Sequence, residues 1–137
     1  MIMRNRRAAL RGTVVGTAAA ATIALAAGGA WAKSDITFTA GPHTARLGSA
    51  IHLTGHGGDD NSTYNRFCVQ QRSGSGGWVT LRCSHGGYHG GGKLDFTVRA
   101  AHRGQWQYRA VLTEASSPTS KHIRVHQISQ VKTVQVR

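Results

Sequence analysis

The sequence predicts an all-β protein, built as a single antiparallel β-sandwich of about seven short strands. Three observations lead to this prediction. Apolar and polar residues alternate in short runs, which is the pattern of strands with one buried face. Clusters of Gly, Ser, Asn and Asp separate these runs at intervals of roughly ten residues. Beyond the N-terminal apolar segment, no stretch has the long 3.6-residue apolar period of an amphipathic helix.

The N-terminal segment has the three parts of a cleavable signal peptide. It begins with arginines at positions 4, 6, 7 and 11, and no acidic residue precedes Asp35. Residues 12–29 are all Gly, Ala, Val, Thr, Ile or Leu, a run too rich in Ala and Gly to make a good membrane anchor. Ala30 and Ala32 then place small residues where a signal peptidase needs them. Cleavage is therefore expected between Ala32 and Lys33.

The chain thus divides into a signal peptide at 1–32 and one domain at 33–137, and the mature protein is expected to be secreted. About one hundred residues suffice for one hydrophobic core but not for two. No cysteine follows the apolar run, so the acylation site of a lipoprotein is missing. An uncleaved N-terminal anchor is the alternative, and the sequence leaves open whether export is by the Sec or the twin-arginine route.

The mature domain is basic. Four of the seventeen Lys and Arg residues lie in the signal peptide, which leaves thirteen against five acidic residues and a formal charge of +8. Such a charge attracts polyanions, so an anionic cell-surface polymer is a candidate partner, whereas nucleic acid is not expected as the physiological one. The alternative is an ordinary solvated basic surface. The candidate polyanion contacts are arginines spread over several predicted strands: Arg66, Arg72, Arg82, Arg99, Arg103, Arg109 and Arg124.

The two cysteines are expected to form a disulfide. An exported chain with an even number of cysteines normally oxidises them, which pairs Cys68 with Cys83. In the chain-entropy model, closing a loop of this length stabilises the fold by on the order of 3 kcal/mol. Two free thiols are one alternative. A zinc site that adds His85 and His89 is another, but the spacing lacks the paired form of structural zinc sites.

The first predicted strands lie in the N-terminal half of the domain. Residues 36–39 alternate Ile-Thr-Phe-Thr before a Gly-Pro pair interrupts the run. Residues 51–54 alternate in the same way and end at a glycine. Residues 66–83 form a candidate hairpin, because a Ser/Gly turn at 73–77 joins two apolar runs.

A disulfide within this hairpin creates a conflict of register. Pairing Cys68 directly with Cys83 puts Leu81 on the face of Cys68, away from Phe67 and Val69. A β-bulge in the Gly/Ser turn would reconcile the two faces, and so would a disulfide that joins loop ends instead of ladder partners. The sequence does not decide between these arrangements.

The second half of the domain starts with a glycine-rich segment. Residues 84–92 include five glycines among nine residues, which predicts a mobile loop. Residues 94–99 and 105–110 then alternate as two further strands, and Ile and Val pairs at 123–125 and 134–136 predict closing strands. Of the large aromatic residues, Trp106 and Tyr108 share one face of their strand with Ala110. Together with Trp78 they are expected in the core, where they cannot stack on a ligand.

These strand patterns resemble those of the Ig-like β-sandwich modules of secreted actinobacterial proteins. The resemblance rests on the succession 36–55, then Phe-Cys-Val-Gln at 67–70 with Trp78, then Tyr-Arg-Ala at 108–110 and Ser-Pro at 117–118, and it covers most of the domain. It implies an Ig-like fold and no particular chemistry. The opening strands and the disulfide-closed hairpin are also similar to the apoproteins of enediyne-binding chromoproteins, which are secreted carriers of a small ligand. Those apoproteins have a second disulfide and are acidic, and this chain has neither feature.

No arrangement of residues in the sequence indicates catalysis. Among the five acidic residues, the neighbouring Asp59 and Asp60 are typical of a solvated turn, and nothing places two carboxyl groups across a cleft. The chain has no Gly-x-Ser-x-Gly motif and no phosphate-binding glycine loop. We therefore expect neither an enzyme nor a cofactor.

No metal site is expected from the histidines. His85 and His89 flank Tyr88 in the glycine-rich segment, and His122 and His126 lie near the end of the chain. Residues four apart on an extended strand are about 13 Å apart, so His122 and His126 would need a bend to share an ion.

The sequence therefore predicts a secreted, non-catalytic, Ig-like binding or interaction module whose partner is not identified. Two alternatives remain open. One is a basic protein that binds a polyanion or the cell wall, and the other is a small-ligand carrier like the enediyne-binding apoproteins.

Intact mass tests the expected processing. Protein from a culture supernatant should have the mass of a chain that begins at Lys33, less the two hydrogens lost on forming one disulfide. Alkylation should label two cysteines only after reduction. An uncut N-terminus or cysteines that react without reduction would contradict the expected export and the expected disulfide.

Overall fold

Nine β-strands and their connecting turns form the part of the chain that the structure describes. The structure is a computed structural model, and it describes residues 34–137. The predicted signal peptide, with its cleavage site between Ala32 and Lys33, lies outside the described residues. No helix occurs within residues 34–137, so none in this range is long and apolar enough to cross a membrane.

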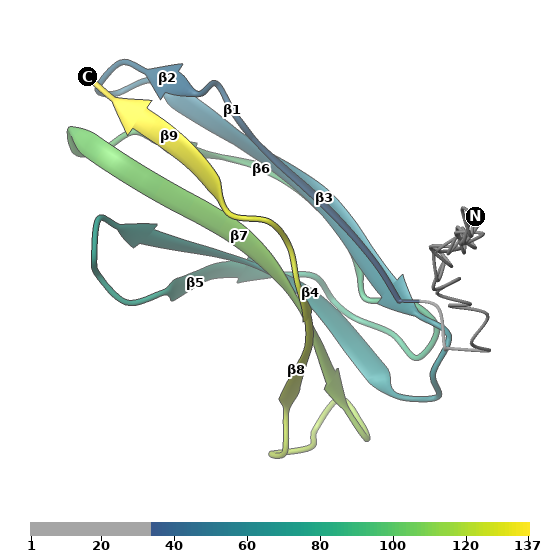
Figure 1. Ribbon diagram of the computed structural model, residues 1–137. Helices are drawn as coiled ribbons and strands as arrows, with labels where there is room; N and C mark the ends of the chain where they lie inside the picture. The colour runs from purple at the N-terminus through teal and green to yellow at the C-terminus, as the bar shows by residue number, and fades with distance from the viewer. Residues whose placement is uncertain (1–33) are drawn as a thin grey trace, which may run out of the picture. The chain divides into compact units, whose positions relative to one another are not determined.

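The strands form two sheets, drawn as two layers in Figure 1. The smaller sheet has the order β1-β3-β6, with β1 at Ser34–Gly41, β3 at Ala50–Asp59 and β6 at Gly92–Arg99. The larger sheet has the order β2-β9-β7-β4-β5, and β8 also pairs with β7. Its strands are β2 at Thr44–Ala45, β4 at Tyr64–Ser73, β5 at Val79–Cys83, β7 at Gly104–Ala115, β8 at Arg124–Ile128 and β9 at Lys132–Val136.

The core lies between the two sheets and is built from residues of both. Ile51 and Leu53 of β3 are fully buried, and so are Phe67 of β4 and Ala110 of β7. Each of these alternates with a more exposed neighbour, because successive side chains of a strand point to opposite faces. The buried cluster consists of Phe38, Ala40, Ala45, Ile51, Leu53, Phe67, Val69, Phe96, Ala100, Tyr108, Ala110, Val134 and Val136.

This architecture confirms the all-β prediction and corrects two of its details. The described residues hold nine strands instead of about seven, because short β2 was missed and the C-terminal strands were placed only roughly. The pairing is also mixed instead of purely antiparallel. β2 runs parallel to β9, with Thr44 opposite Gln135, while every other strand pair is antiparallel.

The predicted hairpin and disulfide are both present. β4 pairs antiparallel with β5, Cys68 lies opposite Cys83, and their sulfurs are bonded. The conflict of register is resolved by a bulge inside the ladder, not in the turn. Val69 pairs with Arg82 and Gln70 with Thr80, so Leu81 is the extra residue and packs against the core.

The glycine-rich segment between β5 and β6 is irregular, as the sequence predicts, but it is tied to both sheets. Gly91 donates its N–H to the carbonyl of Gly57 in β3, and its own carbonyl accepts the N–H of Phe67 in β4. Gly87 exchanges two backbone hydrogen bonds with Asn65, at 2.8 and 3.0 Å. The prediction of a mobile loop is therefore wrong in one respect. The segment is hydrogen-bonded both to the larger sheet, which contains β5, and to the smaller sheet, which contains β6.

A side chain at position 91 should destabilise the fold. A Cβ on Gly91 would lie 2.8 Å from the carbonyl oxygen of Gly57 and in collision with a methyl group of Leu112. We expect Gly91→Ala to lower the free energy of unfolding by about 1–3 kcal/mol, the usual cost of overpacking a core. Urea denaturation would measure it.

The neighbouring residue provides a matched control. A Cβ on Gly90 would meet nothing within 4 Å, so Gly90→Ala should change the free energy of unfolding by less than about 0.5 kcal/mol. Equal losses in the two variants would contradict the close packing described at Gly91.

Candidate functional site

The outer face of the larger sheet gathers polar and cationic side chains from its two central strands. Phe67 and Val69 of β4 point into the core, so Gln70 and Arg72 point outward or toward the strand edge by the alternation of the strand. On β7, Tyr108 and Ala110 are buried in the same way, which turns Gln107 and Arg109 to the outer face. The register then places Gln70 opposite Arg109 and Arg72 opposite Gln107.

Cross-strand hydrogen bonds fix both arginines on this face. Arg72 donates from Nε to Oε1 of Gln107 at 2.5 Å, and Arg109 donates from Nε to Oε1 of Gln70 at 2.8 Å. Gln70 in turn donates to the hydroxyl of Thr80 on β5, at 3.3 Å. Each guanidinium is therefore oriented through Nε. Among the described residues, no hydrogen bond occupies the outer Nη groups of these two arginines.

One indole ring lies against both guanidinium groups. Trp78 stands just before β5, and its ring centroid is 4.4 Å from the Cζ of Arg72 and 4.3 Å from the Cζ of Arg109. Contacts this short are cation–π interactions, and a flat guanidinium also stacks well on an indole. We call Arg72, Trp78 and Arg109 the Arg–Trp–Arg surface.

The electrostatics of this surface are unbalanced. Burial lowers the pKa of Arg109, and the positive charge of Arg72 lowers it further. Arg109 stays cationic at neutral pH because an arginine pKa lies far above 7. Within residues 34–137, neither arginine has a carboxylate partner. Two like charges are thus held side by side without a counter-ion from the protein.

The acidic residues of the domain all lie elsewhere. Asp35 and Asp95 are on the outer face of the smaller sheet, where they contact His56 and His52. Asp59 and Glu114 are buried near β8, and Asp60 is in the turn after β3. The cationic face of the larger sheet therefore has no carboxylate on it.

The other five candidate arginines do not join this surface. Arg66 lies over the ring of Tyr64 with Cζ 5.7 Å from its centroid, and Arg82 lies over Phe96 at 4.5 Å. Arg124 pairs with Glu114 at 2.7 Å.

The two remaining candidates are at the turns. Arg99 ends β6, and Arg103 lies in the turn before β7. The predicted set is therefore spread over the molecule. The structure brings together only Arg72 and Arg109 from it.

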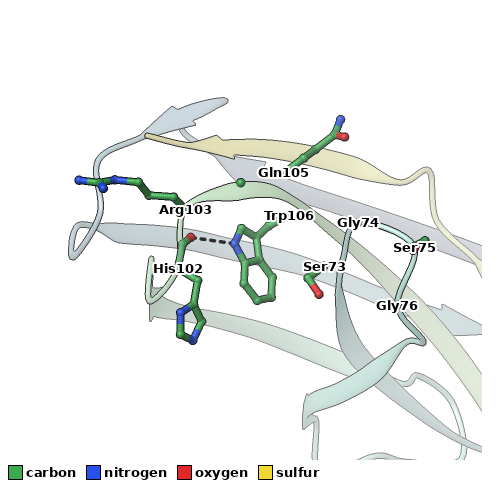
Figure 2. Close-up of a pocket in the computed structure, with 9 residues that line it drawn as sticks. Ser73, Gly74, Ser75, Gly76, His102, Arg103, Gln105 and Trp106 are labelled. Carbon is green, nitrogen blue, oxygen red and sulfur yellow. Dashed lines mark hydrogen bonds between the residues drawn. The ribbon is translucent and has the colours of Figure 1, made fainter.

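A hollow of about 610 Å³ lies beside the turns that precede Trp78 and β7. Figure 2 shows the indole of Trp106 next to His102 and Ser73, with Arg103 directed away from it. The indole N–H donates to the carbonyl of His102 at 3.0 Å, which closes the turn. Glycine backbone and serine make much of the remaining wall. A site for a small apolar ligand is usually lined by several hydrophobic side chains, and this hollow has one.

The structure separates the members of the two histidine pairs named from the sequence. His85 and His89 are both exposed, and His122 precedes β8, in which His126 lies. In the described part of the chain, His126 is the one of these four histidines that belongs to a group of three potential metal ligands, with Asp59 and Glu114.

One expectation about the aromatic residues is wrong and one is confirmed. Tyr108 is buried and Trp106 packs against the core, as expected. Trp78 is only partly buried and lies on the arginines instead. The sequence does contain a signal for the Arg–Trp–Arg surface. Gln and Arg alternate at 70–72 and at 107–109, which predicts two outward-facing polar pairs. These pairs come together only because β4 pairs with β7.

No family model and no curated protein matches this chain. Among solved structures, a β-glucosidase from Listeria innocua has a TM-score of 0.47 and 10% identity, and the match covers 77% of this chain and 16% of that one. The CARDB domain of a Pyrococcus furiosus protein, solved with di-metal ions, has a TM-score of 0.44 and 11% identity over 77% of this chain and 93% of that one. Both TM-scores are below 0.5, and neither likeness carries an argument about fold or activity.

Removing the shared indole should cost measurable stability. We expect Trp78→Ala to lower the free energy of unfolding by about 1–2 kcal/mol, because two cation–π contacts of about 0.5–1 kcal/mol each are lost. Val79→Ala is the control, since Val79 is the next residue and is 59% exposed. It should change the free energy by less than about 0.5 kcal/mol. Equal effects in urea denaturation would show that the indole packs no more tightly than an exposed valine.

Proposed function

We propose that this chain is a secreted, non-catalytic, Ig-like binding module that holds an anionic extracellular polymer on its Arg–Trp–Arg surface. The observation that carries the proposal is the pair of guanidinium groups on one indole, without a carboxylate on that face. An anion placed between the two arginines would relieve their mutual repulsion. The protein supplies no such anion among its described residues.

The geometry supports an anion as the ligand in preference to a neutral sugar. The Nε hydrogen bonds to Gln107 and Gln70 orient the guanidinium planes before any ligand arrives, so less side-chain freedom is lost on binding. The outer Nη donors suit carboxylate, phosphate or sulfate oxygens, which arginine binds in a bidentate manner. A neutral sugar has no charge that could pair with the two guanidinium groups.

The position of the surface supports an extended ligand. The Arg–Trp–Arg surface lies on the outer side of a sheet rather than inside a cavity, so it is open to a chain with repeated charges. The remainder of that face offers neutral hydrogen-bonding groups, since Gln105 pairs with Gln135 and Gln107 with Thr133 across β7 and β9. An anionic polysaccharide or a teichoic acid has this combination of charges and hydroxyl groups.

The other parts of the proposal rest on the sequence together with the fold. The signal-peptide pattern and the Cys68–Cys83 disulfide suit an oxidising compartment. Two packed sheets with a mostly antiparallel order are the architecture that the resemblance to Ig-like modules implies. Carriage of a small ligand stays a prediction, and the hollow at Trp106, with one hydrophobic side chain in its wall, gives it no specific support.

A charge-matched pair of variants tests the surface. Arg72→Gln with Arg109→Gln should weaken binding to an anionic polysaccharide such as heparin by at least tenfold at 0.1 M salt. The slope of log K against log salt should become shallower by roughly 1.5, because two ionic contacts are lost. Arg46→Gln with Arg137→Gln removes the same charge from two exposed arginines and should change both quantities much less.

The two double variants separate a specific surface from general charge. If both weaken binding equally, the attraction comes from net charge alone and the proposed surface is not a binding site. If purified teichoic acid binds no better than a neutral glucan at 0.15 M salt, the module does not bind an anionic polymer.

A further inference from the structure

A second group of ionisable side chains lies where β3 and β7 end and β8 begins. Asp59 is the last residue of β3, Glu114 is near the end of β7, and His126 is in β8. The β7–β8 pairing has an irregularity between Leu112 and Thr113, which sets His126 out of the regular ladder. We call Asp59, Glu114 and His126 the carboxylate–histidine cluster.

This cluster is unusual because its carboxylates are buried. The side chain of Asp59 is fully inaccessible, that of Glu114 is 11% exposed, and that of His126 is 25% exposed. Carboxylates are rarely buried unless they are paired or bind a metal, because the loss of hydration is costly. Arg124 pairs with Glu114 at 2.7 Å and balances one negative charge. With a neutral imidazole, the cluster keeps one negative charge that no basic residue balances.

The histidine lies too far from the carboxylates for ordinary hydrogen bonds. Its Nε2 is 3.6 Å from Oδ2 of Asp59, and its Nδ1 is 3.4 Å from Oε2 of Glu114. An N–H···O hydrogen bond spans about 2.7–3.2 Å. Two ligands bound at about 2.1 Å to one tetrahedral zinc ion lie about 3.4 Å apart, so each of these separations has the size expected for two ligands of one ion. One ion would bind only one of the two ring nitrogens, and the other carboxylate would have to approach that nitrogen. One ligand atom from each residue can be chosen so that all lie within 4.8 Å.

A buried oxygen without a partner adjoins these residues. Asn65 is fully buried, and it is the direct cross-strand partner of Glu114. Its Nδ2 donates to Oδ2 of Asp59 at 3.0 Å and to the carbonyl of Thr113 at 3.2 Å, so its carboxamide lies against the Asp59 side of the cluster. Both partners are hydrogen-bond acceptors, so the end of the carboxamide that contacts them must be the nitrogen, which donates. The other end, Oδ1, has no hydrogen-bond partner in the described structure.

We propose that the carboxylate–histidine cluster, with Oδ1 of Asn65, binds one divalent cation of the zinc type. Two carboxylate oxygens, one imidazole nitrogen and one amide oxygen make a set of four ligands from four residues, the number that zinc takes. The ion would balance the remaining negative charge and give the unpaired oxygen a partner. It would also tie β8 to the ends of β3 and β7.

The ligand chemistry favours a transition metal over calcium or magnesium. Imidazole is a good ligand for Zn²⁺ and its neighbours in the first transition row, whereas Ca²⁺ and Mg²⁺ prefer oxygen ligands only. The site is also small, and Ca²⁺ needs six to eight ligands. We therefore expect Zn²⁺ to bind and Ca²⁺ at the same concentration to have little effect.

Calorimetric titration of the purified protein with zinc chloride tests the proposal. We expect one ion per chain and competition by a chelator. With zinc at a hundredfold excess over Kd, Tm should rise by roughly 10 °C. Cobalt chloride should give a visible absorption band that reports direct ligation by the protein. His126→Ala should weaken zinc binding by at least tenfold and remove most of the rise in Tm, since even residues that only orient a metal ligand contribute tenfold or more.

Other histidines provide matched controls, because an exposed histidine can also bind zinc. His122→Ala and His89→Ala each remove an exposed imidazole outside the cluster, and both should bind zinc as the parent protein does. Glu114→Gln, which keeps the shape of the side chain, should weaken zinc binding and leave the chain folded as judged by circular dichroism.

Two outcomes would overturn the proposal. The first is zinc binding that His126→Ala leaves unchanged, or that His89→Ala abolishes, because the ion would then lie on exposed histidines. The second is no zinc-dependent rise in Tm in the parent protein, which would leave His126 as a purely structural neighbour of two carboxylates. Loss of anion binding in the arginine variants would bear on neither outcome, since the two surfaces share no residue.

Discussion

The two hydrogen bonds of Gly91 are the contact on which the arrangement of the two sheets depends. Its N–H bonds to Gly57 in the smaller sheet, and its carbonyl accepts from Phe67 in the larger one, so one residue joins the layers. The hydroxyl of Ser84 also donates to this carbonyl. Only glycine fits, because a Cβ would collide with Leu112. The chain can therefore leave β5 in the larger sheet and start β6 in the smaller one while staying bonded to both sheets (Figure 1).

The crossing segment between β5 and β6 and the disulfide each hold residues of one of the two proposed sites. The segment's backbone bonds to Asn65 hold the start of β4, where the unpaired carboxamide oxygen lies. The disulfide fixes the other strand of the hairpin, and Trp78, just before that strand, lies against the arginines.

The outer faces of the two sheets differ in their charged residues. The face with Arg72 and Arg109 carries no carboxylate, while the other carries Asp35 and Asp95 beside histidines, together with Lys93 and Arg99.

The strands and the core could be predicted from the sequence because their signal is local. Alternation at Ile51 and Leu53 gives both the strand and the face that it buries, and the structure agrees. The disulfide could also be predicted, from the presence of two cysteines in a chain that is expected to be exported. The register of the hairpin could not be predicted, since a bulge at Leu81 is set by packing against the opposite sheet. The carboxylate–histidine cluster could not be predicted either, because Asp59 is far from Glu114 and His126 in the sequence and only the fold brings it to them.

The bulge at Leu81 has a consequence for self-association. β5 is an edge strand of the larger sheet, and an edge strand with a regular row of free backbone groups is a template for another chain. The extra residue breaks that row, because it turns Leu81 into the core and shifts the backbone groups on either side of it. A neighbouring molecule therefore meets an irregular edge instead of a regular row of free backbone groups. The fold is in this way protected from growing into a continuous sheet through β5.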